Sequence, residues 1–144
     1  TVDNLEIYDA LFDGLDSDFS KLTFNKILVK NSGNDCADFS FGEYEIKNAS
    51  LEICGDKGVS VGETSRVLIT NTLIDNAEIG VASKDFANLR IENSNIKNTN
   101  VCYEAYNKKQ EFAGGYLEIK NSSCDLTNKE KFNKDKVSEI KIIQ

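Results

Sequence analysis

The sequence predicts an all-β protein built as a parallel β-solenoid of about six coils. Three observations support this prediction. A segment of the form apolar-x-apolar-x-Asx recurs six times along the 144 residues, apolar and polar residues alternate in the segments that follow it, and no stretch shows a helical period. Short alternating strands that recur at a fixed period are typical of a solenoid, because each coil buries its apolar side chains only by stacking on its neighbour.

The repeated segment fixes the period of the coil. It ends at six Asx positions: Asp9, Asn31, Asn48, Asn71, Asn93 and Asn121. Consecutive positions are 22, 17, 23, 22 and 28 residues apart, so the period is close to 22. A second and a third short strand follow the first, as in 51–53 and 59–61. One coil is therefore expected to contain three strands.

Stacking brings equivalent residues of successive coils into columns about 4.8 Å apart. The second apolar residue of the repeat is predicted to form one interior column: Ile7, Val29, Ile46, Ile69, Ile91 and Ile119. The Asx positions are predicted to form an asparagine ladder, because a sharp bend favours a left-handed residue and asparagine tolerates that conformation. A β-sandwich also has frequent turns, but it does not explain one residue type at one phase of the repeat.

Composition narrows the classes of function. The formal net charge of −7 argues against a nucleic-acid partner, which needs clustered lysine and arginine. The sequence contains no histidine and no Cys-x-x-Cys, so no metal centre and no required cofactor are predicted. Carboxylates could still bind Ca²⁺ through their oxygen atoms. No run of 18 apolar residues is present, so no membrane span is predicted. The chain begins at Thr1 and lacks methionine, which suggests a piece of a longer chain.

The repeat resembles the right-handed parallel β-helix of the pectin-lyase-like superfamily, in which an asparagine ladder lies at the bend between the second and third strands. The resemblance covers the chain up to about Asp125. It implies a single β-helix domain over residues 1–144, in which about 125–144 form a partial last coil or a C-terminal cap. Uncovered strand edges would allow end-to-end association or flanking domains. The family also implies a secreted or cell-envelope location in a bacterium.

Three segments are similar to active-site motifs of polygalacturonase-type glycosidases on this fold. Residues 34–36 (NDC) are similar to Asp-Asp-Cys, and residues 54–62 (CGDKGVSVG) are similar to a cysteine followed by Gly-His-Gly-x-Ser-Ile-Gly, with Lys57 in place of the histidine. Residues 80–84 (GVASK) are similar to the Arg-Ile-Lys segment, with Ala82 in place of the arginine. The resemblance implies that these segments stack along one outer face, which is the substrate groove in that family.

The cysteines divide into two groups. The resemblance implies a disulfide between Cys36 and Cys54, which lie in adjacent coils. Cys102 aligns with the turn residues Gly58 and Gly80, whereas Cys124 aligns with interior apolar residues. These two side chains are therefore expected to point to different places, with Cys124 as a buried free thiol.

The outward residues of the third strands form the candidate site. The predicted catalytic residues are Asp35, Asp38, Asp56, Lys57 and Lys84. The predicted substrate-binding residues are Glu63, Asp85, Tyr103, Glu104, Tyr106 and Lys108. Close carboxylates interleaved with lysines shift one another's pKa and can run acid–base chemistry, while a solvated charged surface is the alternative. Tyr103 and Tyr106 offer aromatic contacts for a sugar, although one of them could equally point inward.

An inserted loop at 107–115 accounts for the 28-residue spacing and could form a wall beside this face. Taken together, the sequence predicts a carbohydrate-binding or polysaccharide-processing β-helix domain whose partner is a polysaccharide or another glycan. The kind of enzyme stays open among hydrolase, lyase and epimerase. The alternative is a structural or adhesive solenoid without catalysis.

Overall fold

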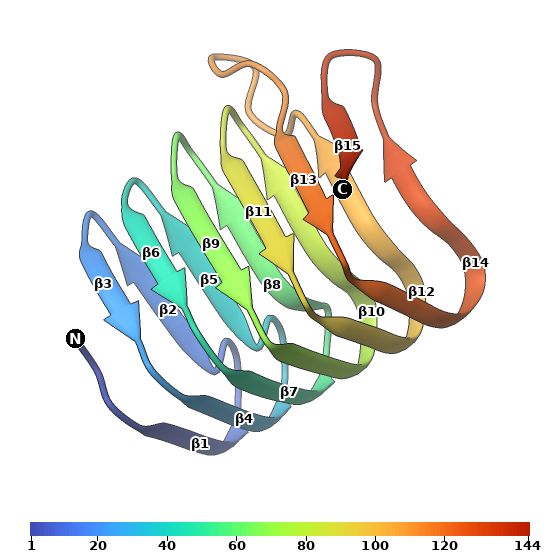
Figure 1. Ribbon diagram of the computed structural model, residues 1–144. Helices are drawn as coiled ribbons and strands as arrows, with labels where there is room; N and C mark the ends of the chain where they lie inside the picture. Colours follow the sequence, from blue (N-terminus) through green and yellow to red (C-terminus); the bar gives the residue numbers. More distant parts are fainter.

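The protein is a right-handed parallel β-helix of six coils (Figure 1). This computed structural model describes the backbone of residues 1–144 and every side chain except those of residues 126–128. The strands are β1 (Leu5–Ala10), β2 (Leu15–Asp18), β3 (Lys21–Phe24), β4 (Ile27–Ser32), β5 (Ala37–Ser40), β6 (Glu43–Ile46), β7 (Ala49–Cys54), β8 (Lys57–Gly62), β9 (Arg66–Thr70), β10 (Thr72–Lys84), β11 (Asn88–Glu92), β12 (Asn95–Tyr106), β13 (Tyr116–Lys120), β14 (Ser123–Lys134) and β15 (Glu139–Ile143).

Each coil passes through three stacked walls. We call the first wall the first arm; it contains β1, β4, β7 and the N-terminal halves of β10, β12 and β14. The second arm contains β2, β5, β8 and the C-terminal halves of the same three long strands, which bend from one arm into the other. The third wall is a six-stranded sheet in the order β15-β13-β11-β9-β6-β3. All strand pairs are parallel, so the prediction of an all-β parallel solenoid is confirmed.

The residues that the sequence predicted to form one interior column belong to two different columns. The first-arm column is Ile7, Val29, Leu51, Ile74, Ile96 and Cys124. The column of the six-stranded sheet is Phe24, Ile46, Ile69, Ile91 and Ile119, and it ends at the exposed Ile142 in the last coil. The single-column prediction was wrong because the apolar-x-apolar-x-Asx pattern occurs on two different strands of the coil. The 17-residue spacing marks the change from one strand to the other.

The asparagine ladder is confirmed, and it also divides into two. The first runs along the end of the first arm through Asp9, Asn31, Ile53, Asn76 and Asn98, all with positive φ. The second follows the six-stranded sheet through Asn71, Asn93 and Asn121, also with positive φ. Amide groups link neighbouring coils: Asn31 Nδ2 donates to Asp9 Oδ1 at 2.7 Å, and Asn121 Nδ2 donates to Asn93 Oδ1 at 2.7 Å. The left-handed bends and these cross-coil bonds are what asparagine was expected to supply.

The C-terminal region forms the sixth coil. Strands β14 and β15 pair with β12 and β13, so residues 123–143 contribute to the first arm, the second arm and the six-stranded sheet. Figure 1 shows these strands at the end of the rod opposite to the N-terminus.

Two disulfides join neighbouring coils. Cys36 and Cys54 are bonded, as the family resemblance implies. Cys102 and Cys124 are also bonded, with Cα atoms 6.1 Å apart, so the prediction of a free thiol at Cys124 was wrong. The error arose because Cys102 was assigned to a turn. Strand β12 continues through Cys102, and its fully buried side chain lies in the core beside the next coil.

Candidate functional site

The predicted site lies on the outer face of the second arm. Along β8 the side chains of Val59 and Val61 point into the core, so Ser60 between them faces outward, and the ion contacts of Lys57 place its side chain at the edge beside Asp35 and Asp56. Register places one outward residue of each coil in a row: Asp16, Asp38, Ser60, Ala82, Glu104 and Asn133. The sequence placed these strands correctly because their spacing follows the coil period.

Lys57 is the centre of a charged cluster. Its Nζ lies 2.5 Å from Asp56 Oδ2 and 3.9 Å from Asp35 Oδ1, and its backbone N–H donates to Asp35 Oδ1 at 3.0 Å. Lys57 and Asp35 are both buried, whereas the side chain of Asp56 is 38% exposed. Asp35 is held in turn by Asp13, whose Oδ1 accepts its backbone N–H at 2.9 Å. The lysine ammonium therefore bridges a buried and an exposed carboxylate from adjacent coils.

Burial changes the proton affinity of both groups. It raises the pKa of Asp35 to about 6, against the opposing charge of Lys57 and with the help of Asp38 and Asp56. Burial works to lower the pKa of Lys57, but the hydrogen bond to Asp56 and the charge of Asp35 outweigh it and raise that pKa. Asp35 thus titrates near pH 6, while Lys57 remains an ammonium.

Glu104 and Tyr106 complete the group, which we call the Lys57 cluster (Asp35, Asp56, Lys57, Glu104 and Tyr106). Burial raises the pKa of the half-buried Glu104. The hydrogen bond from Asn133 at 2.7 Å and the charge of Lys57 act to lower that pKa, but the effect of burial is larger. Burial also raises the pKa of Tyr106, which lies within the field of Lys57, Glu104 and Asp56. The cluster therefore presents a carboxyl group of raised pKa on the same wall as a carboxylate that is fixed by a lysine.

Two polar atoms beside the cluster have no partner. Asp38 Oδ1 and the hydroxyl oxygen of Ser60 are buried and make no hydrogen bond to the described residues. The two residues are direct neighbours in register, and Ser60 is fully buried although its row faces outward. Buried polar atoms without partners are costly, so an enclosed water molecule would be favourable at this point of the wall. The sequence indicated Asp38 but gave no signal for Ser60.

A second group of charges lies at the edge of the same face. The stem of Lys84 crosses Gly62, where an added Cβ would lie 3.1 Å from Lys84 Cε, so the glycine makes room for the lysine. Glu63 is buried; it accepts a hydrogen bond from Ser40 Oγ at 2.7 Å and forms an ion pair with Lys109. Burial works to raise the pKa of Glu63, but the bonds from Lys109 and Ser40 lower it. The predicted binding residue Glu63 is thus already occupied by the inserted loop.

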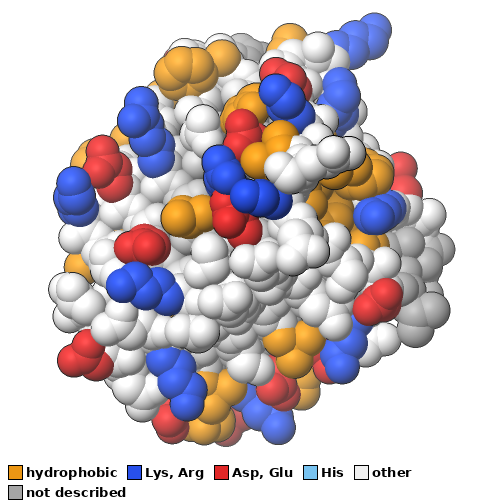
Figure 2. Space-filling model, in the orientation of Figure 1, with side chains coloured by type: hydrophobic (Ala, Val, Ile, Leu, Met, Phe, Trp, Pro, Cys, Tyr) orange, Lys and Arg blue, Asp and Glu red, His pale blue; other side chains and the backbone are white. Residues whose placement is uncertain are grey.

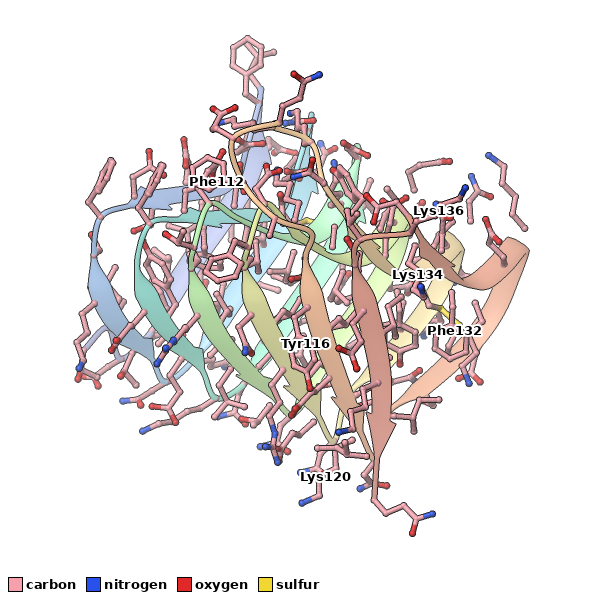
Figure 3. The ribbon with its side chains drawn as sticks, turned by 90° about the horizontal axis from the view of Figure 1, so that it is seen from above. Phe112, Tyr116, Lys120, Phe132, Lys134 and Lys136 are labelled. Carbon is pink, nitrogen blue, oxygen red and sulfur yellow. A yellow bond between two sulfur atoms is a disulfide. The ribbon has the colours of Figure 1, made fainter. Side chains whose placement is uncertain are left out.

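Asp85 anchors the loop between β12 and β13. It is fully buried, and its Oδ1 accepts the backbone N–H groups of Lys108 at 2.7 Å and Lys109 at 2.8 Å, together with the side-chain amide of Asn107 at 3.4 Å. The loop leans back over the turns of earlier coils, where Phe112 lies 6.4 Å from Phe41 between ring centroids (Figures 1 and 3). Asp85 therefore holds the loop, and the side chain of Lys108 is left exposed.

Tyr103 points into the core instead of onto the face. It is fully buried and its ring stacks on Phe132 at 5.6 Å. Its register partner Val81, and Val59 one coil further along the same column, are interior residues, so the strand register already places Tyr103 inside. This position removes Tyr103 from the set of groups that can contact a bound sugar directly.

Sequence reasoning missed an aromatic edge beside the site. Phe19 and Phe41 stack in parallel with ring centroids 4.6 Å apart, and Phe19 is 75% exposed. Both have positive φ, which asparagine or glycine adopts with less strain. The signal was present, because the two phenylalanines are 22 residues apart and directly follow the second-arm strands β2 and β5 of successive coils.

The fold and the site describe a right-handed parallel β-helix protein with an acidic and basic cluster on one wall. Comparison with protein-family models, with curated proteins and with solved structures gives no match. Among the described residues, no helix has the length and apolar character that crossing a membrane requires. In the same part of the chain, no group of three or more His, Cys, Asp or Glu side chains is arranged to hold a metal ion, so Ca²⁺ binding stays a sequence-based prediction.

Proposed function

We propose that this domain binds a glycan on the outer face of the second arm and processes it by acid–base chemistry. One observation carries the proposal: the Lys57 cluster gathers carboxyl groups of raised pKa, a lysine-bound carboxylate and a tyrosine on one wall of a rigid scaffold. Enzymes that cleave glycosidic bonds need one carboxylic acid to protonate the leaving oxygen and one carboxylate to attack or to activate water. A raised pKa keeps a carboxylic acid protonated near neutral pH.

The accessible members of the cluster take the chemical roles in this proposal. Glu104 is half-buried and burial raises its pKa, so it is the candidate acid, and the exposed Asp56 is the candidate carboxylate. Lys57 orients Asp56 and stabilises developing negative charge. Asp35 lies behind Lys57 and acts as a positioning residue for it. Asp38 and Lys84 would bind hydroxyl or carboxylate groups of the sugar at the rim.

The fold adds support of a more general kind. Three parallel strands per coil, right-handed winding and left-handed asparagine bends are the features that resemble the pectin-lyase-like superfamily, and we propose a distant likeness to it. Two disulfides are compatible with an extracellular protein, and we propose a secreted or envelope location. Membership of the polygalacturonase type is not part of the proposal, because the histidine and the arginine of its motifs are replaced by Lys57 and Ala82.

A glycan array followed by mass spectrometry of the products, with and without Ca²⁺, tests the proposal. Glu104→Gln and Asp56→Asn should each lower turnover at least about 100-fold and retain binding, as expected for loss of a general acid or base. Glu52→Gln is the matched control, because Glu52 is a half-buried carboxylate on the first arm, paired with Lys30 at 3.9 Å. Binding without any product would contradict processing and leave a recognition domain. No binding to any glycan would contradict the whole proposal and favour a structural solenoid.

A further inference from the structure

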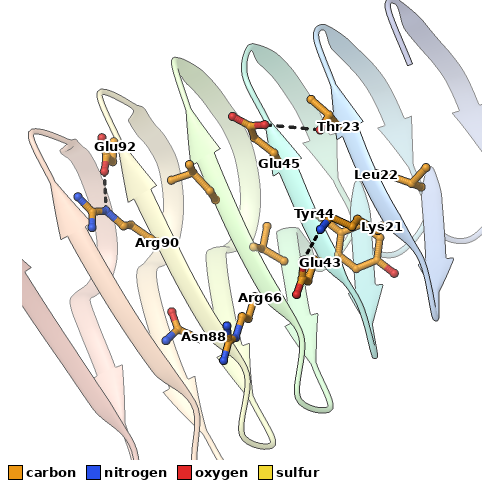
Figure 4. Close-up of a pocket in the computed structure, with 12 residues that line it drawn as sticks. Lys21, Leu22, Thr23, Glu43, Tyr44, Glu45, Arg66, Asn88, Arg90 and Glu92 are labelled. Atoms are coloured by element: carbon orange, nitrogen blue, oxygen red, sulfur yellow. Dashed lines mark hydrogen bonds and ion pairs between the residues drawn. The ribbon is translucent and has the colours of Figure 1, made fainter. Parts of the chain in front are cut away.

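The outer face of the six-stranded sheet carries a hollow that the acid–base cluster does not use. It has a volume of about 550 Å³ and lies over β3, β6, β9 and β11 (Figure 4). This volume is within the range of small-molecule sites, about 300–1,000 Å³. Figure 2 shows acidic and basic side chains interspersed over the visible face instead of gathered by sign. The hollow belongs to a different wall from the Lys57 cluster, so it is argued independently of the proposed function.

Most of the charges around the hollow neutralise each other. Lys21 Nζ lies 3.1 Å from Glu43 Oε2, and Arg90 Nε lies 2.5 Å from Glu92 Oε1. These two ion pairs form opposite ends of the hollow and leave no net charge there. They therefore act as walls, and they are not the groups that would select a ligand.

Two lining residues of opposite sign remain without an ion partner. Arg66 forms no ion pair and no side-chain hydrogen bond with any described residue, and its register neighbour on β11 is Asn88. Glu45 has no cation within ion-pair distance among the described side chains and accepts only a long hydrogen bond from Thr23 Oγ1, at 3.5 Å. Figure 4 shows Arg66 beside Asn88, and Glu45 beside Thr23.

The backbone positions of Arg66 and Glu45 are close enough for one small ligand to reach both side chains. Glu43 is the direct register partner of Arg66 on the parallel strand β6, so the backbone of Glu45 lies one strand across and two residues along, about 8 Å away by strand spacing and rise. Leu68 is the register partner of Glu45 and the outward residue next to Arg66 on β9, so an apolar side chain lies between the charges. The guanidinium fork of arginine fits a carboxylate, and the adjacent amide of Asn88 offers a further donor.

We propose that this hollow binds a zwitterion, a small molecule or sugar unit that carries an ammonium group and a carboxylate a few bonds apart. Its carboxylate contacts Arg66 and Asn88, its ammonium contacts Glu45 and the hydroxyl of Thr23, and its apolar part lies on Leu68. The paired walls exclude ligands of large net charge, because a second unmatched charge would meet no partner. Two sources share this chemistry, a free α-amino acid and an amino sugar that bears a carboxylate.

Titration followed by amide NMR and by calorimetry tests the proposal. The probes are leucine and muramic acid for the two sources, with leucine amide and N-acetylleucine as analogues that lack one of the two charges. We expect amide chemical-shift changes confined to β3, β6, β9 and β11. At least one zwitterion should bind more tightly than either leucine analogue by about ten-fold or more, since each analogue loses one charged contact. Arg66→Gln and Glu45→Gln should each weaken the binding of that zwitterion by a similar factor.

The control is Lys47→Gln, which removes an exposed charge near the same sheet but outside the hollow and should leave binding unchanged. All three positions are on the surface or half-buried, so the fold of each variant can be checked by its circular dichroism and Tm. Equal affinity for the zwitterions and their one-charge analogues, shifts elsewhere on the protein, or no binding of either zwitterion would each overturn the proposal.

Discussion

Replacing Ile53 by asparagine should stabilise the β-helix. Ile53 occupies the first ladder between Asn31 and Asn76, and its φ is +56°. The left-handed conformation brings the Cβ of an L-residue close to the carbonyl oxygen that follows, and a β-branched side chain makes the crowding worse. Asparagine tolerates this conformation, as it does at the neighbouring positions of the ladder. The chain therefore carries backbone strain at one step of an otherwise polar bend.

The expected gain is about 1 kcal/mol. Relief of the left-handed strain contributes about 1–2 kcal/mol. A new amide hydrogen bond to the ladder adds about 0.5–1.5 kcal/mol, as the bond between Asn31 and Asp9 suggests. Ile53 is 44% exposed, so loss of its partial burial costs about 1 kcal/mol. For a chain of this size, a net gain of about 1 kcal/mol raises Tm by about 2–4 °C.

Differential scanning calorimetry and urea unfolding of the disulfide-intact protein measure the effect. Ile53→Ala is the matched control, because it loses similar apolar area but keeps an ordinary L-residue in the left-handed region. Ile53→Gly separates the two gains, since it relieves the strain without offering an amide and adds flexibility to the unfolded chain. An Ile53→Asn protein that is no more stable than Ile53→Ala would refute the strain argument.

Three further predictions concern charge, covalent links and the loop. The pKa of Asp35 is raised to about 6 in the folded protein, so the protonated carboxyl stabilises the fold at low pH, and this contribution is lost as the pH rises from about 4 to 6. The free energy of unfolding of Asp35→Asn should therefore rise by on the order of 2 kcal/mol relative to that of the native protein over this interval. Urea unfolding at several pH values measures the difference. Replacing Cys102 and Cys124 together by serine should lower the free energy of unfolding by about 3 kcal/mol, as loss of a cross-link over 22 residues predicts, and an unchanged urea midpoint would contradict this. Asp85→Ala removes the acceptor of two loop N–H groups and should speed tryptic cleavage after Lys108, whereas Asp85→Asn should have a smaller effect; equal cleavage rates in all three proteins would argue against an anchoring role.

The fold was largely predictable from local patterns, but the assignment of columns was not. Period-two alternation and a 22-residue repeat are direct consequences of strands stacked in coils, so both were visible in the sequence. The prediction combined residues of two interior columns into one, because two bends of the coil both place asparagine after the same apolar-x-apolar pattern. Asn31 and Asn48 look alike in sequence, yet they follow different walls. The disulfide between Cys102 and Cys124 was missed for a related reason, since a strand that bends without a turn gives no local signal.

The candidate site shows where sequence reasoning ends, because the role of a charged residue depends on which partner reaches it. Asp35, Asp56 and Lys57 follow the strand spacing, and the structure brings them together as the stacking of adjacent coils requires. Asp85 has the same chemistry, but it directly follows a second-arm strand, and its Oδ1 accepts the backbone N–H groups of a loop inserted 22 or more residues later. Only the path of that loop distinguishes an anchoring carboxylate from an available one. Exposure separates the two cases: the side chain of Asp56 is 38% exposed and can meet a ligand, whereas Asp85 is fully buried beneath the loop that it anchors.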